Sequence, residues 1–328
     1  LSEYEKMNGE TYKSTAYKKV LPMIKKVNDD SSLTDEYLLS VRGLGAKLLE
    51  KIHEIKNTGT CSMYEKIKGL KDPREDFMKI HGVGAKKAKQ LVDQGFQSIE
   101  DLRSCVSISG VLNDKQQIGL KYFEDLQKRI PYEEIKTHEK VLKQQLVHED
   151  PNAEITITGS YRRRKPTSGD IDVLLTHPNI KNEEEAKNVD YISKFLNKLK
   201  EKDLLIANLG SGNTKFNGIT KLTPKHKARR IDIRFVSYNS FYPALLYFTG
   251  SGNFNIEMRV RAKNMGYKLS EYYLSKIQTS KPILPGKTIN KKDIIGETPV
   301  PVKSEKEIFD VLSMDYLEPK DRERGKGH

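Results

Sequence analysis

Two carboxylates stand two residues apart in the segment 159-GSYRRRKPTSGDIDVLL-175, behind a cationic loop. Alternate side chains of a strand face the same side, so Asp170 and Asp172 would share one face, about 6.5 Å apart, if they enter a strand. The run 229-RRIDIRFV-236 would place Asp232 opposite its apolar residues, within about 5 Å of the pair if the two strands are neighbours. Three carboxylates at that distance repel one another unless cations lie between them. The pattern therefore predicts a site for Mg²⁺, a hard ion that prefers oxygen ligands.

Two such ions about 3.5 to 4 Å apart would form a clamp for in-line phosphoryl displacement. The alternative interpretation is a solvated acidic turn, and an isolated Asp-x-Asp pattern would favour it. The neighbouring residues favour the metal site, because the strand EITIT leads into Gly159 and Ser160, which can bind a phosphate together with Arg163. A strand followed by Gly-Ser, with Gly-Asp-x-Asp ten residues later, is typical of the nucleotidyltransferase fold.

The elements that would position these residues follow from the pattern of apolar residues. From residue 1 to about residue 142, apolar residues recur at helical spacing between glycine-containing breaks, so this half is predicted to be all-α. After Pro151 the runs EITITGS, IDVLLT and RRIDIRFV alternate in the manner of strands, so the second half is predicted to be α+β. We expect the Pro-rich segment 281–303 to be a long loop, followed by one amphipathic helix near 305-EKEIFDVL-312.

Two near-repeats stand in the helical half, 41-VRGLGAKLLEKI-52 and 80-IHGVGAKKAKQL-91. A Gly-x-Gly turn that enters a helix leaves backbone N–H groups for a phosphate oxygen, with help from the helix dipole and the following Lys. One copy alone would fit an ordinary turn between helices, but two matching copies in a basic chain favour two helix-hairpin-helix grips on a DNA backbone. The residues concerned are Gly43, Gly45 and Lys47 in the first copy and Gly82, Gly84 and Lys86 in the second.

The composition restricts the class of protein and its partners. The chain has 328 residues, room for two or three globular units, and its 58 Lys and Arg against 45 Asp and Glu give a net charge of +13, which favours a polyanionic partner. Cys61 and Cys105 lack the spacing of a zinc site or a disulfide framework, as expected in a reducing intracellular compartment. No apolar run is long enough for a membrane span or a signal peptide, and the first residue is Leu1, so we expect a short N-terminal piece to precede it.

Further motifs follow one another along the chain: GLKYFEDLQKRIP, GSYRRR with SGDIDVLLTHP, TKF, RRIDIR, YFTGSGNFNIEMR and YLEPKDR. Together with the two near-repeats, they resemble the family X DNA polymerases, and among these the beta type. The resemblance implies a multidomain α+β protein with an all-α lyase domain at about 1–69, a helical duplex-binding subdomain at 70–131, a nucleotidyltransferase palm at 132–238 and a small α+β nucleotide-selection subdomain at 239–328. The implied activity is DNA-directed DNA synthesis that fills short gaps in base excision repair.

By this resemblance, Asp170 and Asp172 would bind two Mg²⁺ ions, or Mn²⁺ in their place, and Asp232 would bind the catalytic ion and help to activate the primer 3′-hydroxyl. The triphosphate of the dNTP would be held by Ser160, Arg163 and the Gly169 backbone. The further contacts implied are Arg230 with the primer-terminal phosphate, Tyr247, Phe248 and Gly250 as a wall against the sugar, and Asn255 and Arg259 at the minor groove. From the residues alone, the two aromatics would instead be core residues.

Two residues near the expected nucleotide site depart from the family pattern. Gly252 stands where a family member can carry a longer side chain over the incoming base, and Arg164 stands where a Gly is found beside the phosphates. Nucleotide affinity and fidelity therefore do not follow from the resemblance. The segment 278–293 is longer than in close relatives and carries several Lys, and we interpret it as a surface insertion rather than a DNA contact.

A second activity follows from the resemblance. Lys51 falls on the Schiff-base lysine of the 5′-deoxyribose phosphate lyase, and Lys13, Tyr17 and Lys47 match its supporting residues. A lysine that attacks a sugar aldehyde must be uncharged, and the neighbouring cations would favour that form. From composition alone, Lys51 would be a phosphate-binding residue on a basic helix. The family also implies a Na⁺ or K⁺ ion at the two turns, held by the carbonyls of Val41 and Leu44 and of Met78, Ile80 and Val83.

The partners expected are gapped or nicked double-stranded DNA, a dNTP and other repair proteins, with no membrane and with the chain as a monomer. The expected compartment is intracellular, and nuclear if the host is a eukaryotic cell, with a virus-encoded or organellar protein left open. Two alternatives to templated gap filling are a template-independent terminal nucleotidyltransferase and a catalytically weak protein that binds nicks and gaps. The short connection between TKF and RRIDIR disfavours the first, and the presence of all three aspartates disfavours the second.

Overall fold

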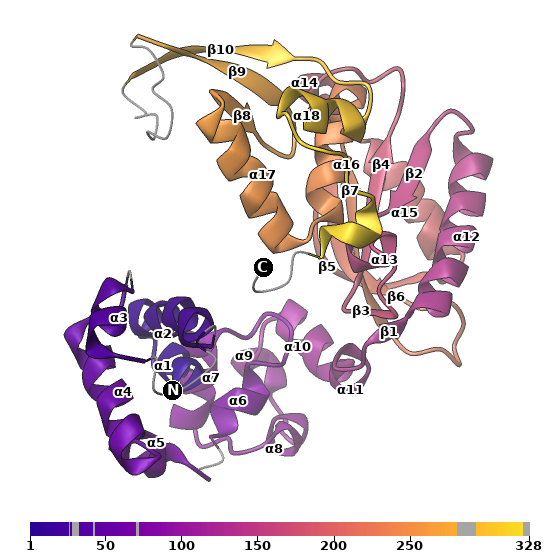
Figure 1. Cartoon of the computed structure of the whole chain (residues 1–328). Coiled ribbons are helices and arrows are strands. Elements are labelled where there is room, and N and C mark those ends of the chain that lie inside the picture. The colour runs from indigo at the N-terminus through magenta and orange to yellow at the C-terminus, as the bar shows by residue number, and fades with distance from the viewer. Residues whose placement is uncertain (26, 28–32, 42, 70–71, 281–292, 324–328) are drawn as a thin grey trace. The chain divides into compact units, whose positions relative to one another are not determined.

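Helices alone make up the secondary structure described for residues 1–123 (Figure 1). These residues form one of the two units into which the contacts of the chain divide it, and residues 124–325 form the other. The computed structural model describes residues 1–25, 27, 33–41, 43–69, 72–280 and 293–323. Within those ranges, none of the helices combines the length and the apolar character that crossing a bilayer requires.

The prediction of an all-α first part is confirmed for the described part of the first unit. Its helices are α1 (Ser2–Met7), α2 (Thr11–Ile24), α3 (Asp35–Ser40), α4 (Ala46–Thr58), α5 (Ser62–Ile67), α6 (Pro73–Phe77), α7 (Ala85–Asp93), α8 (Ile99–Arg103), α9 (Ile108–Val111) and α10 (Asp114–Lys121), while α11 (Phe123–Leu126) crosses the boundary between the units. A hydrophobic core runs from α6 to α10, with Phe77, Leu91 and Leu102 completely buried. Side chains at Asn113 and Gln116 form a capping box that fixes the start of α10.

Helix α10 lies directly against the Gly-x-Gly turn of the second near-repeat. A Cβ atom at Gly119 would lie 2.8 Å from backbone atoms of His81, so this close approach requires glycine. The side-chain amide of Gln116 donates a hydrogen bond to the Gly82 carbonyl over 2.8 Å. The packing of α10 therefore holds the second turn in one conformation.

The second unit is built on a five-stranded sheet in the order β2-β4-β7-β6-β5. Strands β4 and β7 pair in parallel, and the other neighbours pair antiparallel. The strands of this unit are β1 (Ile130–Pro131), β2 (Glu154–Ile157), β3 (Thr167–Ser168), β4 (Ile171–Thr176), β5 (Leu205–Gly212), β6 (Lys215–Thr220), β7 (Arg229–Phe235), β8 (Tyr267–Leu269), β9 (Leu274–Thr279) and β10 (Ile294–Val300). The predicted mixture of helices and strands is thus confirmed, and the strands predicted for EITIT, IDVLLT and RRIDIRFV are present.

Helices cover one face of this sheet and part of the other. The helices of the unit are α12 (Tyr132–Glu149), α13 (Gly159–Arg162), α14 (Glu183–Asn188), α15 (Tyr191–Glu201), α16 (Phe241–Thr249), α17 (Gly252–Asn264) and α18 (Glu305–Val311), with 3-10 turns at Tyr238–Ser240 and Pro319–Arg322. Apolar residues of α12 and α15 pack on the side chains of Ile171, Val173, Ile231 and Ile233 in the largest core cluster. Helix α16 packs on the opposite face of the sheet, against Leu174 of β4 and the buried residues near it.

A second sheet, in the order β10-β9-β8, packs with α16, α17 and α18 around Phe254 and Phe309. The predicted helix near 305–312 is confirmed as α18. The prediction that 281–303 is one long loop is wrong for 294–300, because β10 pairs there with β9 and Pro299 lies opposite Ser275. An edge strand tolerates proline, since one side of its backbone has no partner strand. Of the lysine-rich segment 278–293, Gln278 and Thr279 belong to β9 and are no loop, while residues 281–292 lie outside the described residues.

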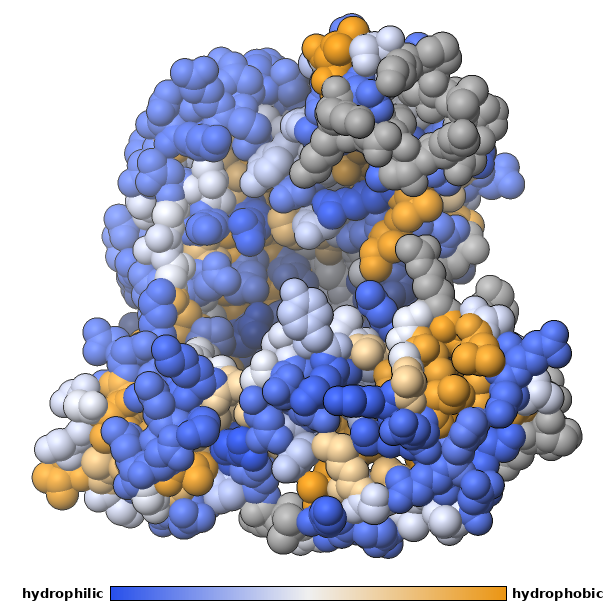
Figure 2. Space-filling model, turned by 90° about the vertical axis from the view of Figure 1, so that its left-hand side faces the viewer, coloured by the Kyte–Doolittle hydropathy of each residue, from blue (hydrophilic) through white to orange (hydrophobic). Residues whose placement is uncertain are grey.

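A chain with 31% charged residues is expected to have a largely hydrophilic surface. Figure 2 shows that hydrophilic side chains cover most of the face in view, while hydrophobic residues gather in separate patches.

Candidate active site

The register of two parallel strands brings the predicted carboxylates together. Asp172 on β4 lies directly opposite Asp232 on β7. The residues on either side of them, such as Ile171 and Ile231, are completely buried in the core on the other face of the sheet. Because alternate residues face the same side, burying these isoleucines turns both aspartates toward the opposite face.

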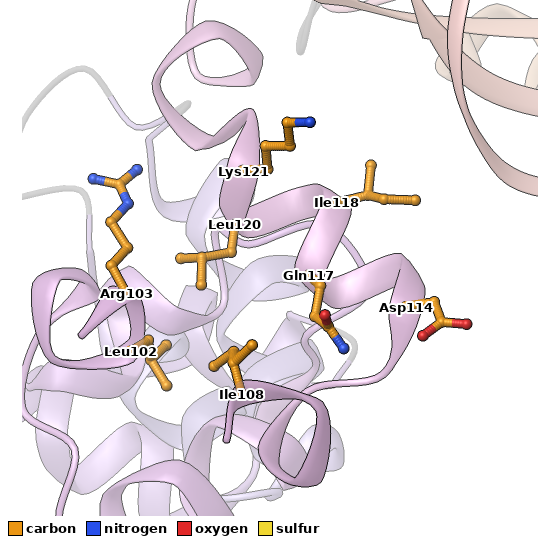
Figure 3. A pocket seen from close by; sticks show the side chains of 8 residues that line it. All are labelled: Leu102, Arg103, Ile108, Asp114, Gln117, Ile118, Leu120 and Lys121. Carbon is orange, nitrogen blue, oxygen red and sulfur yellow. The ribbon is translucent and has the colours of Figure 1, made fainter. Parts of the chain in front are cut away.

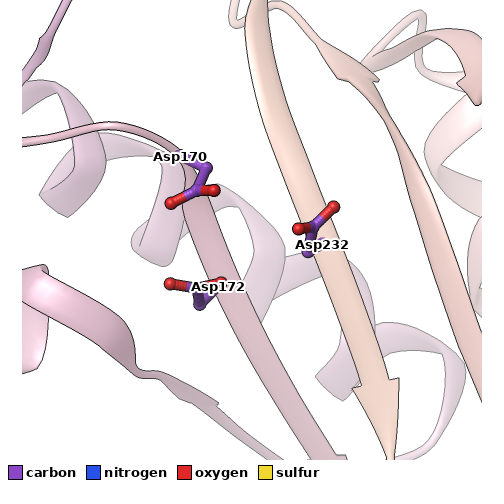
Figure 4. Close-up of side chains that lie close together, drawn as sticks. All are labelled: Asp170, Asp172 and Asp232. Atoms are coloured by element: carbon purple, nitrogen blue, oxygen red, sulfur yellow. The ribbon is translucent and has the colours of Figure 1, made fainter. Parts of the chain in front are cut away.

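Asp170 completes the group from the residue that precedes β4. Oxygen atoms of the three carboxylates, one from each, lie within 4.8 Å of one another, and all three residues are partly exposed (Figure 4). Among the described residues, this is the group of His, Cys, Asp and Glu side chains that could hold a metal ion. Three carboxylates with access to water form an oxygen-only donor set, which fits Mg²⁺ or Mn²⁺ better than a softer ion.

When no cation lies between the three carboxylates, their negative charges repel one another and make ionisation less favourable. Burial raises the pKa of Asp172 to about 7, with a further contribution from the negative charges of Asp170 and Asp232. Burial also raises the pKa of Asp232, although the nearby Arg230 opposes this change. The Arg230 guanidinium donates from Nη2 to Asp170 over 2.7 Å and to Asp232 over 3.2 Å. It therefore supplies one positive charge to the acidic group.

The loop expected to bind phosphate begins against this acidic group. Gly159 has a φ of +60°, and a Cβ atom there would lie 2.1 Å from a carboxylate oxygen of Asp172, so the approach requires glycine. The Ser160 hydroxyl lies 2.8 Å from the Ser168 hydroxyl. Arg164, where the family has Gly, has a φ of +59°, a conformation that glycine adopts at less cost. The structure thus gives a backbone reason for the family's glycine.

The Arg163 side chain connects the loop to the C-terminal segment. Its Nε donates to the Glu323 carboxylate and its Nη1 to the Thr249 carbonyl, each over 2.5 Å. A Cβ atom at Gly250 would lie 3.2 Å from this guanidinium, which explains a small residue there. Arg163 is also close enough to Asp172 to lower the pKa of that carboxyl against the effect of burial.

Sequence reasoning missed the carboxylates that hold this side of the site. Arg162 makes a bidentate ion pair with Glu305, at 3.0 and 2.7 Å, and the completely buried Arg322 donates to the same carboxylate over 2.6 Å. Glu323 binds Arg163 in the same region. The motif YLEPKDR was recognised, but nothing in it shows that Arg322 is buried or that Glu323 reaches a loop 160 residues earlier.

The residues expected to contact the sugar and the base pair gather on α16 and α17. The Tyr247 and Phe248 rings meet edge to face at 5.1 Å between centroids, and both rings are half-buried rather than core. The Asn255 amide donates to the Tyr247 carbonyl over 2.7 Å. The Arg259 guanidinium lies 4.8 Å from the centre of the Tyr247 ring and 3.3 Å from Glu271. A Cβ atom at Gly252 would meet open space, so no packing constraint explains the glycine.

In the first unit, one pocket of about 640 Å³ collects the residues expected to act on an abasic sugar. Its lining includes Lys13, Tyr17, Gly43, Gly45, Lys47 and Lys51. Lys51 is partly exposed on α4, and Lys47 lies one turn earlier on the same helix. The lining also contains the buried Glu5, which sequence reasoning missed and which lies 3.9 Å from the Lys13 ammonium.

The two Gly-x-Gly turns have matching conformations. The first glycine of each has a positive φ, +99° at Gly43 and +82° at Gly82, and the second glycine is the N-cap of the following helix. Each turn is closed by an N–H donated three residues back, from Leu44 to Val41 and from Val83 to Ile80. These hydrogen bonds occupy the carbonyls of Val41 and Ile80, two of the carbonyls that were expected to bind a monovalent ion. Ion binding at either turn, including the contribution expected from Met78, stays a prediction.

Another hollow of the first unit, of about 490 Å³, lies between α8, α9 and α10 (Figure 3). Leu102, Ile108 and Leu120 line its base, while Asp114 and Lys121 stand at its edge. This lining holds a single carboxylate, Asp114, and a single lysine, Lys121, in place of the three carboxylates or the several lysines of the two sites above, so it adds no candidate chemistry.

Comparison with known proteins agrees with this arrangement. Family models match the DNA polymerase beta palm at residues 129–238, the DNA polymerase beta thumb at 244–323 and the fingers domain of DNA polymerase lambda at 75–127. DNA polymerase lambda of Rattus norvegicus is 32% identical over 331 residues, which cover 98% of this chain and 54% of the relative. DNA polymerase lambda of Arabidopsis thaliana is 29% identical over 326 residues, covering 96% and 58%.

A third relative is the DNA polymerase type-X family protein pol4 of Schizosaccharomyces pombe, 25% identical over 348 residues, which cover 99% of this chain and 63% of the relative. The chain thus spans between about half and two thirds of the length of the curated relatives it matches.

Proposed function

Because this chain belongs to the type-X family of DNA polymerases, we propose that it is a DNA-directed DNA polymerase that fills short gaps during repair. The observation that carries the proposal is the group of three carboxylates on β4 and β7 beside a loop that presents Arg163 and Ser160. This arrangement suits nucleotidyl transfer, in which charge on phosphate oxygens must be neutralised next to the attacking hydroxyl.

In this proposal, Asp170 and Asp172 would hold two Mg²⁺ ions, and Asp232 would hold the catalytic one of them. When bound, the ions lower the pKa of the primer 3′-hydroxyl and neutralise the leaving pyrophosphate. Asp232 orients that hydroxyl through its carboxylate. Arg230, which bridges Asp170 and Asp232 in this structure, would contact the primer-terminal phosphate.

The remaining residues of the site bind the incoming nucleotide. Arg163, the Ser160 hydroxyl and the Gly169 backbone hold its triphosphate. Tyr247 and Phe248, with Gly250, lie against its sugar and disfavour a 2′-hydroxyl. Asn255 and Arg259 contact the minor groove of the nascent pair. The hydrogen bond from Asn255 to the Tyr247 carbonyl supports the idea that these residues act as one wall.

We further propose a 5′-deoxyribose phosphate lyase activity for the first unit. Lys51 attacks the sugar aldehyde as an amine and forms a Schiff base with loss of water, while Lys13, Tyr17 and Lys47 hold the 5′-phosphate. Loss of a C2′ proton and cleavage of the C3′–O bond then release the downstream DNA strand, and water hydrolyses the Schiff base to free the sugar and the lysine. The support is the shared pocket that these side chains line. The two Gly-x-Gly turns then grip the DNA backbone on either side of a gap, each with a Na⁺ or K⁺ ion.

The proposed domain division follows from these assignments. A lyase domain occupies about 1–69, a duplex-binding subdomain 70–131, a palm 132–238 and a nucleotide-selection subdomain 239–328. The proposed substrates are gapped or nicked DNA and a dNTP, and the protein works as an intracellular monomer, in the nucleus of a eukaryotic cell, with other repair proteins.

A terminal transferase is the competing proposal, since the same carboxylates serve template-independent addition. The connection from the end of β6 at Thr220 to the start of β7 at Arg229 is short, and this favours a template position that is not filled by the protein itself.

Single-nucleotide incorporation with Mg²⁺ tests the polymerase proposal. The substrates are a one-nucleotide gap with a 5′-phosphate and a blunt single strand, and the proteins are wild type, Asp232→Ala and the control Asp315→Ala, whose aspartate is exposed and distant from the acidic group in sequence. We expect templated insertion by the wild type and the control and none by Asp232→Ala. Addition to the single strand would instead establish the transferase, and tight gap binding without incorporation would establish a binding protein.

Borohydride trapping on DNA with an incised abasic site tests the lyase proposal. We expect a covalent adduct with wild type and with the control Lys66→Ala, whose lysine is exposed on α5 and absent from the pocket lining. Lys51→Ala should lose the adduct. An undiminished adduct in that variant would assign the nucleophile to another amine.

A further inference from the structure

Two cations of the phosphate-binding loop share one carboxylate of the C-terminal segment. The Arg163 Nε donates to Glu323 Oε1 over 2.5 Å, and the Lys165 ammonium lies 3.2 Å from Oε2 of the same carboxylate. The Arg163 side chain is 14% exposed, while those of Lys165 and Glu323 are 41% and 34% exposed. The two cations, Arg163 and Lys165, are therefore accessible to solvent on the side where Glu323 lies.

The backbone that carries Glu323 is fixed by its neighbour. Arg322 is completely buried among the rings of Phe254 and Phe309, and its guanidinium donates to Glu305 over 2.6 Å. The Ser251 hydroxyl donates to the Arg322 carbonyl over 2.9 Å. The backbone next to Glu323 is thus held in place, and this positions the Glu323 carboxylate against the loop.

The loop itself turns so that alternate cations face this carboxylate. The Arg164 N–H donates to the Tyr161 carbonyl over 2.8 Å, and the Lys165 N–H donates to the Ser160 carbonyl over 3.0 Å. With Arg164 in the left-handed conformation, Arg163 and Lys165 converge on one point. Two converging cations make a site for an anion with several oxygen atoms.

We propose that Arg163 and Lys165 together bind the terminal phosphates of the incoming nucleotide, and that Glu323 is a built-in carboxylate that occupies this cation pair until phosphate displaces it. This inference rests on the proposed polymerase function and assigns Lys165 and Glu323 as determinants of nucleotide affinity. A phosphate chain carries more charge than one carboxylate, so it wins the competition when it binds. Removing Glu323 should therefore tighten phosphate binding, which the loss of a merely structural contact would not do.

The Glu323 carboxylate stays ionised at neutral pH and so can compete. Burial by itself would raise its pKa, but hydrogen bonds from Arg163 and Lys165 outweigh that effect and lower it. The position also allows a neutral amide of the same shape, because Gln keeps the length of the side chain and one acceptor oxygen.

Titration calorimetry of the full chain with Mg²⁺ and inorganic tripolyphosphate tests the proposal, because this probe has phosphates but neither sugar nor base. We expect the Kd to fall about three- to tenfold in Glu323→Gln and to rise about three- to tenfold in Lys165→Gln, which correspond to about 0.7 to 1.4 kcal/mol each. The matched controls Asp321→Asn and Lys320→Gln remove one exposed charge each from the same C-terminal segment and should leave the Kd within about twofold.

The double variant adds a test of competition. Glu323 holds Lys165 before phosphate binds, so the loss caused by Lys165→Gln should be larger when Glu323 is already Gln. For dNTP incorporation, Glu323→Gln should lower the KM with kcat unchanged. Thermal melting of each variant shows that the fold is retained.

Unchanged or weaker tripolyphosphate binding in Glu323→Gln would overturn the inference, as would unchanged binding in Lys165→Gln. If the wild type incorporates dNTP under those results, the polymerase proposal stands and only this inference fails. If the Kd values change as expected while no variant incorporates dNTP, the cation pair is supported and the polymerase proposal fails. If neither binding nor incorporation is found, both fail.

Discussion

Replacing Asp172 by asparagine should stabilise the metal-free protein while removing its proposed activity. The Asp172 carboxyl has an unfolded pKa of about 3.8 and a folded pKa of about 7, because burial and then the charges of Asp170 and Asp232 oppose ionisation. A difference of about three pKa units corresponds to about 4 kcal/mol of lost stability above pH 7. Since water reaches the partly exposed carboxyl and screens part of the repulsion, we expect Asp172→Asn to regain about 1 to 3 kcal/mol. Asparagine has the same shape, so it also fits against Gly159.

The sign of the pH dependence follows from the raised pKa. Well below the unfolded pKa of about 3.8, the carboxyl of Asp172 is protonated in both the folded and the unfolded chain, so its charge contributes no difference in stability between wild type and variant. As the pH rises from about 4 to about 7, the unfolded chain ionises while the folded chain keeps its proton, and the wild type loses stability relative to the variant. The advantage of Asp172→Asn should therefore be smaller at pH 5 than at pH 8.

Hydrogen exchange followed by mass spectrometry measures this effect on peptides that cover β4 and β7, because the two units need not unfold together. The proteins are wild type, Asp172→Asn and the exposed control Asp315→Asn, in EDTA and in Mg²⁺ at pH 5 and pH 8. Mg²⁺ should slow exchange in the wild type more than in Asp172→Asn, so the difference between them shrinks. A variant that exchanges faster than wild type in EDTA at pH 8, or an advantage equal at both pH values, would refute the reasoning.

Three other substitutions have defined outcomes. Gly159→Ala should lower stability by more than about 2 kcal/mol, because the residue has a left-handed φ and its Cβ would clash with Asp172; urea unfolding that matches wild type would contradict this. Arg229→Met should lower the free energy of unfolding by about 3 to 5 kcal/mol in the same assay, because it leaves the Glu134 carboxylate unpaired. Adding Glu134→Met should restore most of this stability, and a double variant that stays unstable would indicate a packing defect instead. Glu305→Ala should cost about 3 to 5 kcal/mol, since two largely buried arginines lose their shared counter-charge, and a loss below about 1 kcal/mol would mean that water replaces it.

The acidic group could be predicted from the sequence because its geometry depends on local periodicity. Alternation in IDVLL and RRIDIRF fixes which residues are buried, and the aspartates are left on the other face. The remaining step, that the two strands are neighbours, needed the resemblance to a known family or the structure itself. The structure gives the register in which Asp172 and Asp232 stand opposite each other.

Contacts between distant segments could not be predicted in this way. Glu323 and Arg163 meet only because α16, α17 and the buried Arg322 set the path of the last residues, and no periodic pattern encodes that path. Strand β10 was missed for a different reason. Gly296 and Pro299 have low strand propensity, yet pairing with β9 at the edge of a sheet overrides it. The lysines that line the pocket of the first unit were named from the resemblance, and the role of Lys51 stays a prediction.

The parallel pairing of β4 with β7 also determines when the acidic group can form during folding. The chain between these strands makes α14, α15, β5 and β6, so Asp172 cannot meet Asp232 until all of that segment has been synthesised and its ends brought together. Closing this loop costs chain entropy before the pairing of the two strands compensates for it, so we expect the acidic group to form after the folding transition state. Metal binding should then leave the folding rate unchanged and slow unfolding instead, so that Mg²⁺ lengthens the lifetime of the folded protein.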